Sequence, residues 1–372
     1  MIELTESFLF NILGGVLFII LLFQLFISSK SGAKFDNVSC FSLIFTVVVF
    51  FGFRSVSSGV DTLAYHRYFE HVSLFQINNL GFEPGFYLFT RVFSYFNAWN
   101  AYLIAIVLIQ LFFVFVSAKL LRIKSVFLVL LLYVALLPGF DLLTNGLRQG
   151  VALCFGGTML VLAHNNTKYK LLSVIPFLFH KSLLLNSLLV FIPRFFAKLS
   201  IIRLLVILGA VVAGVGFLGS QFGGGVQFSS LLPIPLPGSG HTLGAKMDMY
   251  LYIEKQLLSN TMKMYFLILS YSLFLPYLYY LFTRPEVVVR LNFIALVTVV
   301  MHNIYLLIWW TNFSYRFMYI SYVPIILLSI ASIEGAKGKY FMFYLYLIAL
   351  LGVFTTYSSK NYSSFTFGNL LG

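Results

Sequence analysis

The sequence predicts an all-α, polytopic integral membrane protein. Of its 372 residues, 60% are hydrophobic and only 9% are charged, whereas an average soluble domain carries about 25% charged residues. So few charges cannot cover the water-facing surface of several soluble domains. The apolar residues also fall into repeated runs of about the length that spans a bilayer as a helix. The 43 Phe and 23 Tyr exclude a chain that stays unfolded in water.

Ten apolar segments are candidates for transmembrane helices, because a bilayer core about 30 Å thick needs roughly 20 residues of helix. The first follows Glu3 and Glu6 and has no small-residue cleavage pattern, so we expect a span there and not a secretory signal. The ten segments are residues 8–27, 38–53, 99–118, 125–140, 148–163, 204–220, 264–283, 291–310, 317–333 and 340–357.

Six connectors rich in Lys and Arg orient these helices. Their only acidic residues are Asp36, Glu286 and Glu334, and an excess of Lys and Arg marks cytoplasmic loops. The net charge of +13 therefore reflects membrane topology, and nucleic acid is not expected as a partner. The basic residues of the connectors are Lys30 and Lys34; Lys119, Arg122 and Lys124; Lys168 and Lys170; Arg194, Lys198 and Arg203; Arg284 and Arg290; Lys337 and Lys339.

The apolar stretch 171–193 carries His180 and Lys181 at its middle. Placing all six basic connectors on one side requires the chain to enter and leave on that side between Lys170 and Arg194. We therefore expect two short half-helices that meet near residues 179–182, with His180 and Lys181 at the outer tip. The alternative is one ordinary span with an internal His-Lys pair, which would invert every later loop.

This topology gives about twelve crossings with both termini outside, in a single transmembrane domain over residues 1–372. We expect an external amphipathic segment at 54–98. We expect a Gly/Pro-rich external loop at 221–263, because its sequence cannot form a spanning helix, and we interpret it as either a lid or a loose loop. A polar, flexible tail is expected at 358–372.

The charges outside the connectors gather in short blocks at the predicted outer ends of helices. Ionisable groups at the membrane edge are costly and usually functional. The blocks are residues 51–69 with 81–86, 145–150, 179–182 and 314–317. Their clustering on one side favours an outward-facing site.

In this order and spacing, the blocks resemble those of bacterial polysaccharide polymerases of the EpsG and Wzy (O-antigen polymerase) type. The resemblance covers residues 51–317. The matching blocks are Arg54 to Tyr65, which resembles R…G.D...Y; Glu83-Pro84-Gly85-Phe86, which resembles EPGF; Leu147-Arg148-Gln149, which resembles LRQ; Phe179-His180-Lys181-Ser182, which resembles FH.S; and Tyr315-Arg316-Phe317, which resembles the late RF.

The resemblance implies a GT-C-like membrane glycosyltransferase on the periplasmic face of the bacterial inner membrane. It would move a growing glycan from undecaprenyl pyrophosphate to a sugar hydroxyl of another lipid-linked repeat unit, producing O-antigen or exopolysaccharide. The lipid-linked donor and acceptor, membrane lipids and a chain-length regulator protein are the partners it implies.

Three arginines are candidates for binding the pyrophosphate, because Arg binds phosphate oxygens in bidentate fashion better than Lys. They are Arg54, Arg148 and Arg316. Arg148 stands out because it lies in the first turn of a helix whose N-terminus would point outward and favour an anion. The alternative for Arg148 is a snorkelling side chain that touches lipid phosphate.

Asp61, Glu83 and His180 are the candidates for the general base that an attacking sugar hydroxyl needs. Alternatively, Asp61 pairs with Arg54 or Arg67, Glu83 caps the helix after Pro84, and His180 is a satisfied buried histidine. Further candidates for contacts to sugar or pyrophosphate are Tyr65, His66, Arg67, Gln149, Lys181 and Tyr315; the aromatic residues among them would equally suit lipid headgroups.

No metal and no cofactor are expected. The sequence has no Asp-x-Asp pair and no Walker A or G-x-G-x-x-G context for a nucleotide, so arginine electrostatics would support departure of the pyrophosphate. Cys40 and Cys154 lie in apolar runs and suit small buried hydrophobes better than a disulfide framework.

Two other functions stay open at this point. An O-antigen ligase, which would attach the glycan to lipid A core, has the same composition. A transporter or flippase would line several spans with polar groups, whereas Gln110 and His302-Asn303 are the main interior exceptions here. The blocks therefore favour the polymerase.

Overall fold

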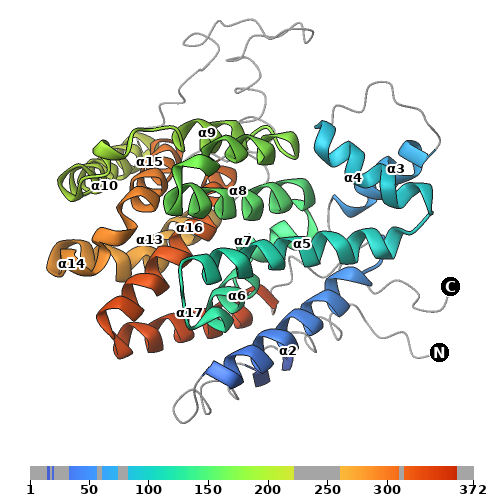
Figure 1. Cartoon of the computed structure of the whole chain (residues 1–372), viewed down its shortest axis with the longest axis horizontal. Coiled ribbons are helices and arrows are strands. Elements are labelled where there is room, and N and C mark those ends of the chain that lie inside the picture. The colour runs from blue at the N-terminus through green and yellow to red at the C-terminus, as the bar shows by residue number, and fades with distance from the viewer. Residues whose placement is uncertain are drawn as a thin grey trace, which may run out of the picture. The chain divides into compact units, whose positions relative to one another are not determined.

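The structure is a computed structural model that describes residues 15–16, 19–20, 33–56, 61–73, 83–221, 260–309 and 314–357. Within these ranges the chain is all-helical and contains no strand (Figure 1). The expected first span at 8–27 lies almost wholly outside the described residues. Nearly all of the expected lid at 221–263 and the whole tail at 358–372 also lie outside them.

The chain divides into two compact units. Unit 1 comprises Met1–Ile192 with Ile326–Gly372, and unit 2 comprises Pro193–Ile325. In unit 1, two amphipathic helices of 12 residues each lie in the chain between two longer apolar ones. The helices of unit 1 are α2 (Ala33–Gly52), α3 (Thr62–Ser73), α4 (Pro84–Tyr95), α5 (Trp99–Leu120), α6 (Val126–Ala135), α7 (Leu137–Thr144), α8 (Leu147–Asn165), η1 (Thr167–Leu178), α9 (Leu183–Leu189), α17 (Lys339–Tyr357) and the second half of α16 (Ser314–Ala336).

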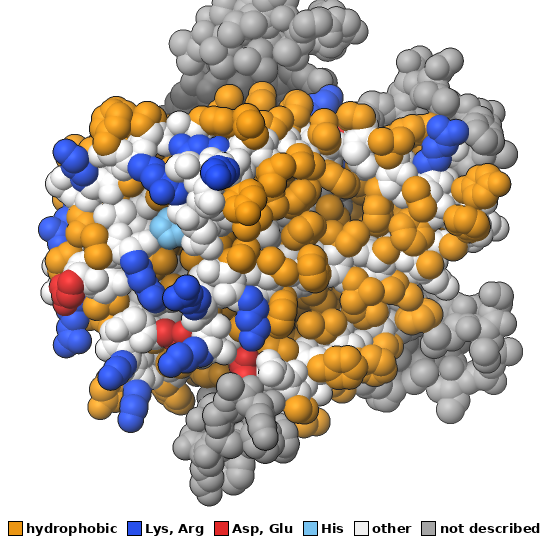
Figure 2. Space-filling view, in the orientation of Figure 1, with side chains coloured by type: hydrophobic (Ala, Val, Ile, Leu, Met, Phe, Trp, Pro, Cys, Tyr) orange, Lys and Arg blue, Asp and Glu red, His pale blue; other side chains and the backbone are white. Residues whose placement is uncertain are grey.

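Among the described residues, five helices are long and apolar enough to cross a membrane, or six if one bent pair counts as a single span. The expected count of about twelve is therefore not confirmed. Helix α8 is not among these five, since it carries Arg148, Gln149 and His164 together with several glycines. Exposed apolar side chains cover much of the face seen in Figure 2, as a lipid-facing surface requires.

Helix α6 is the most deeply buried helix of unit 1, because all ten of its residues are buried. It packs against α2, α5 and α17. Its N-terminal amides are bonded by carboxylates from two other helices. Asp36 Oδ1 accepts from the N–H of Phe127 at 3.3 Å, and Glu334 accepts from the N–H groups of Lys124 and Ser125 at 2.7 to 3.1 Å. An anion at this end also complements the helix dipole.

The expected span at 125–140 is not one straight helix. It is α6 and α7, which meet at an angle of 74°. Leu136 is extended between them, with φ −96° and ψ 149°. The break follows from Pro138 in the first turn of α7, since proline has no N–H to bond the carbonyl four residues earlier and its ring clashes with that carbonyl, so α6 cannot continue through it.

The stretch 171–193 forms the expected pair of short helical segments. Segments η1 and α9 flank a turn at residues 179–182. The two fold back on each other, because Lys170 Nζ donates to the carbonyl of Ile192 at 3.3 Å and the Ser187 hydroxyl donates to the carbonyl of Ser173. The two ends of this hairpin therefore lie side by side, as the same-side entry and exit requires. Its position in a membrane stays a prediction.

Connectors that the charge pattern places on one side do meet in unit 1. Asp36, Lys124 and Glu334 come from three predicted cytoplasmic connectors and gather at the start of α6. Arg54 binds instead at the C-terminus of α7, beyond the other end of α6. The sidedness derived from Lys and Arg stays a prediction.

Unit 2 contains η2 (Arg194–Phe196), α10 (Leu199–Gln221), α13 (Asn260–Thr283), α14 (Pro285–Val288), η3 (Val289–Leu291), α15 (Asn292–Ile308) and the first half of α16. Helices α10 and α15 pack closely, since Asn303 Nδ2 donates to the carbonyl of Leu205 at 2.8 Å and Trp309 Nε1 donates to that of Ala213 at 3.0 Å. The polar residue Asn303 thus serves helix packing. His302 beside it is buried among aromatic rings.

Substituting Glu334→Ala is expected to lower the stability of the protein by about 1 to 2 kcal/mol, because two amides at the start of α6 lose their acceptor. Thermal unfolding of the purified protein in detergent measures the effect. Glu286→Ala is the control and should change the midpoint little, because Glu286 is exposed on the four-residue α14 (Pro285–Val288). Equal midpoints for both variants would show that α6 does not depend on this cap.

Candidate functional site

Three of the blocks singled out in the sequence converge on the carboxylate of Glu83. Arg148 Nη1 donates to Glu83 Oε2 at 2.7 Å, and the backbone N–H of Lys181 donates to Glu83 Oε1 at 3.2 Å. The side chains of Glu83 and Arg148 are 6% and 21% exposed. One buried carboxylate thereby joins the start of α4, the start of α8 and the tip of the η1–α9 hairpin. We call these three residues the Glu83 junction.

Glu83 is placed for this role by the residue that follows it. Pro84 opens α4 and holds Glu83 extended, with φ −66° and ψ 146°. The carboxylate makes no capping hydrogen bond to its own helix. Glu83 is thus the N-cap residue of α4, as the alternative expected, but its side chain bonds to two other segments.

Gly85 allows α4 to approach the hairpin. A Cβ atom at this position would lie 2.8 Å from the carbonyl oxygen of Leu178, at the end of η1. That contact is with backbone and cannot be relieved by a side-chain rotation. The glycine in Glu83-Pro84-Gly85-Phe86 therefore serves a close approach of two backbones.

Arg148 has an aromatic as well as an ionic environment. Its Cζ lies 6.0 Å from the centre of the Phe86 ring, and it forms a hydrogen bond with the side chain of Tyr65. Burial raises the pKa of Tyr65, while the charge of Arg148 opposes the rise and that of Asp61 adds to it. Because the N-terminus of α8 also carries a partial positive charge, the site around Arg148 favours an anion, which at present is Glu83.

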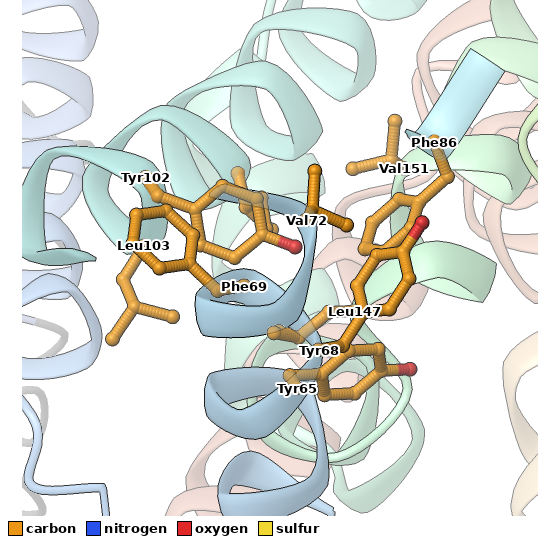
Figure 3. Packing of buried hydrophobic residues seen from close by; sticks show 10 residues of the cluster. Tyr65, Tyr68, Phe69, Val72, Phe86, Tyr102, Leu103, Leu147 and Val151 are labelled. Carbon is orange, nitrogen blue, oxygen red and sulfur yellow. The ribbon is translucent and has the colours of Figure 1, made fainter. Parts of the chain in front are cut away.

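Helices α3 and α4 are held over this site by aromatic packing. Each has 12 residues, about 18 Å of helix, which is too short to cross a bilayer. Figure 3 shows side chains of both helices packed with residues of α5 and α8. The buried cluster is Tyr65, Tyr68, Phe69, Val72, Phe86, Tyr102, Leu103, Ile106, Leu147 and Val151.

The ring of His180 is oriented by Ser182. The backbone N–H of Ser182 donates to His180 Nδ1 at 3.2 Å, and the Ser182 hydroxyl lies 2.7 Å from the same nitrogen. Because a backbone N–H can only donate, Nδ1 is unprotonated and the neutral ring carries its proton on Nε2. His180 therefore presents an N–H donor at Nε2, whereas a general base would need an acceptor there.

Arg54 is 1% exposed and binds backbone. Its guanidinium donates to the carbonyls of Phe51 at 3.0 Å, Leu143 at 2.8 Å and Thr144 at 3.2 Å. The last two are terminal carbonyls of α7 that have no partner within the helix. Burial lowers the pKa of Arg54 to about 9, so the group stays charged at neutral pH. The contact with a pyrophosphate that we expected for Arg54 stays a prediction.

The other expected residues differ in setting. Asp61 is exposed at the start of α3. His66 Nδ1 lies 3.6 Å from Glu70 Oε1, and its ring meets Trp99 edge-on at 4.8 Å, while Arg67 is exposed. Gln149 is buried in the first turn of α8. Arg54 donates to backbone carbonyls, which differs from the expected alternative in which it pairs with Asp61.

Tyr315 and Arg316 belong to unit 2, at the start of α16. Arg316 Nε donates to the Tyr315 hydroxyl at 3.2 Å, and the Tyr315 ring stacks on Phe266 at 6.0 Å. Arg316 is exposed. Their expected contacts with pyrophosphate or sugar stay predictions.

No group of three or more His, Cys, Asp or Glu side chains within the described ranges could hold a metal ion. The residues of the Glu83 junction are one carboxylate, one guanidinium and one amide N–H. Two of these three are donors, so the junction suits an oxyanion better than a cation.

The fold and the site together define a polytopic helical membrane protein with a charged, anion-favouring junction at one end of its helices. A model of the EpsG family matches residues 37–367. The chain therefore belongs to the EpsG family, which is the polysaccharide polymerase family. No curated protein and no solved structure matches the chain.

Gly85→Ala is expected to weaken the junction, because its Cβ would collide with the Leu178 carbonyl and push α4 away from the hairpin. We expect the midpoint of thermal unfolding to fall by several degrees, corresponding to about 1 to 3 kcal/mol. Gly214→Ala on α10 is the matched control, since a Cβ there meets nothing within 4 Å. If both variants unfold at the same temperature, the close approach at Gly85 does not matter for stability.

Proposed function

We propose that this protein polymerises undecaprenyl-pyrophosphate-linked oligosaccharide repeat units on the periplasmic face of the bacterial inner membrane. Membership of the EpsG family supports the polymerase activity. The observation that carries the site is the Glu83 junction, in which the Glu83, Arg148 and Lys181 segments meet. Its donors and the N-terminus of α8 offer the positive potential that a diphosphate needs.

In the proposed reaction, a hydroxyl oxygen of the acceptor sugar attacks the anomeric carbon of the donor glycan. The bond between that carbon and the diphosphate oxygen breaks, and the lipid diphosphate leaves with the bonding electrons. Arg148 stabilises the charge that develops on the leaving oxygens, and the N–H at His180 Nε2 donates to one of them. These contacts are stronger in the transition state than in the ground state, which is what accelerates the step.

The hydroxyl proton needs an acceptor, and the three candidates differ in their surroundings and in their exposure to solvent. Glu83 already accepts from Arg148 and Lys181, and His180 has its proton on the nitrogen that faces away from Ser182. Asp61 is an exposed carboxylate whose charge acts on Tyr65, as does that of Arg148. We therefore assign the general base to Asp61, and to Glu83 the orientation of Arg148.

Arg148→Ala is expected to abolish polymerisation, and Arg148→Lys to leave weak activity, because Lys keeps the charge but loses the bidentate donor pair. The assay combines purified protein with an undecaprenyl-pyrophosphate-linked repeat unit in EDTA and resolves the products on a gel. If the Arg148 variants give the same product ladder as the wild-type protein, the polymerase activity stands but Arg148 is not part of its site. The absence of any ladder would favour a ligase or a flippase.

His180→Gln is expected to retain more activity than His180→Asn. The amide nitrogen of Gln reaches the position of the ring Nε2 and donates from it, whereas that of Asn reaches only the position of Nδ1. We expect His180→Asn to lower the polymerisation rate by about 10²-fold or more, with His180→Gln clearly less affected. Equal losses in both variants would contradict a donor role at Nε2.

A further inference from the structure

The middle of α5 contains a polar group that none of the blocks includes. Gln110 is 0% exposed and lies within the otherwise apolar span Trp99–Leu120. A buried amide at membrane depth is costly unless all its groups are bonded. The hydrogen-bond partners of Gln110 explain why an amide is buried at this position.

The two ends of the Gln110 amide contact different helices. Nε2 donates to the carbonyl of Leu142 at 3.2 Å, and Oε1 accepts from the hydroxyl of Tyr133 at 2.6 Å. The Sγ of Cys154 in turn donates to the Tyr133 hydroxyl at 3.3 Å. The amide orientation is fixed, because the Leu142 carbonyl can only accept. One side chain thus connects α5, α6, α7 and, through Tyr133, α8.

Gln110 also touches α8 directly, next to the site. A Cβ atom at Gly150 would lie 2.5 Å from Gln110 Oε1, so the backbone of α8 rests against the amide two residues after Arg148. Leu142 lies just before the corner at Asn145 and Gly146, where α7 ends and α8 begins. Gln110 therefore contacts both sides of the corner that sets the direction of the first turn of α8.

The last carbonyls of α7 have no partner in their own helix, and two buried side chains share them. Gln110 binds that of Leu142, and Arg54 binds those of Leu143 and Thr144. With these bonds the corner has a defined direction. Without the hydrogen bonds from Gln110 and Arg54, the angle between α7 and α8 could change, and Arg148 in the first turn of α8 would shift.

We propose that Gln110 is a positioning residue that holds the α7–α8 corner so that Arg148 faces its anion. This rests on the proposed function, in which Arg148 binds a lipid diphosphate. The residue acts through Leu142 and Gly150 and does not touch the substrate.

The test measures binding of farnesyl diphosphate to the purified full-length protein, together with its thermal unfolding. Gln110→Met keeps the side-chain volume but loses both hydrogen bonds, and we expect it to weaken diphosphate binding about tenfold. The matched control is Thr158→Val, which breaks a hydrogen bond of 2.9 Å to Ser117 between the same helices α5 and α8, away from the corner. It should lower the unfolding midpoint and leave diphosphate binding unchanged.

A rescue variant separates positioning from general stability. In Gln110→Glu, a carboxyl group that carries its proton can donate to Leu142 and accept from Tyr133 as the amide does. Burial at this position raises the pKa of a carboxyl group, so the Glu side chain carries its proton at about pH 5 and loses it as the pH rises. We therefore expect near wild-type binding at about pH 5 and weaker binding at about pH 8, each relative to the wild-type protein at that pH. Should Gln110→Met fail to fold, Tyr133→Phe removes a single hydroxyl and should weaken binding less, about threefold.

The outcomes distinguish the two proposals. If the wild-type protein and Arg148→Ala bind the diphosphate equally, or neither binds it, the diphosphate site at Arg148 is wrong and the positioning role falls with it. If Arg148→Ala loses binding but Gln110→Met and Tyr133→Phe bind as the wild type does, only the positioning role is wrong. Equal weakening by Thr158→Val and Gln110→Met would likewise overturn it, because the effect would then be general destabilisation.

Discussion

Unit 1 depends on hydrogen bonds to the ends of a buried, broken helix. The last residues of α7 are buried, and carbonyls left unpaired there would cost several kcal/mol each in a hydrocarbon environment. At the start of α6, Lys124 is exposed and Ser125 half-buried. Carboxylates of Asp36 and Glu334 bind amides at the start of α6. At the far end of α7, Arg54 and Gln110 bind the carbonyls. Anions at the amino end and a cation at the carboxyl end also match the dipole of the pair.

The same arrangement produces the site. Because α7 must end where Arg54 and Gln110 take its carbonyls, α8 begins immediately afterwards, with Arg148 in its first turn. The aromatic cluster then holds α3 and α4 over that turn, and Pro84 presents Glu83 to it. The corner between α7 and α8 thus needs polar side chains to bond the carbonyls of α7 and also places Arg148 at the candidate site. This is why many polar side chains of this apolar unit lie near the corner.

The sequence predicted the all-helical membrane class, because long apolar runs are local signals, while the count of about twelve crossings is not confirmed. It also predicted the hairpin of two short segments that turns near His180, because all six basic connectors can lie on one side only if the chain turns back there. It did not predict the bend at Leu136, although Pro138 was a visible signal within an apolar run that reads as one span. The pairing of Glu83 with Arg148 and the carbonyl ligands of Arg54 were also missed, because partners 65 to 90 residues apart are set by tertiary packing and leave no spacing pattern. Gln110 stood out only as an amide in an apolar segment.

The ion pair between Glu83 and Arg148 has a consequence for selectivity. A carboxylate tethered 2.7 Å from the guanidinium is present at a high effective concentration, so it competes with any anion that arrives from solution. A dissolved singly charged anion has little to gain by displacing it. The diphosphate of the proposed substrate would carry more charge, and its lipid tail would confine it to the plane of the bilayer, where its local concentration would be high. Without substrate, Arg148 would therefore stay paired with Glu83 in a solution rich in simple anions. It would exchange this partner for an anion that is held in the membrane.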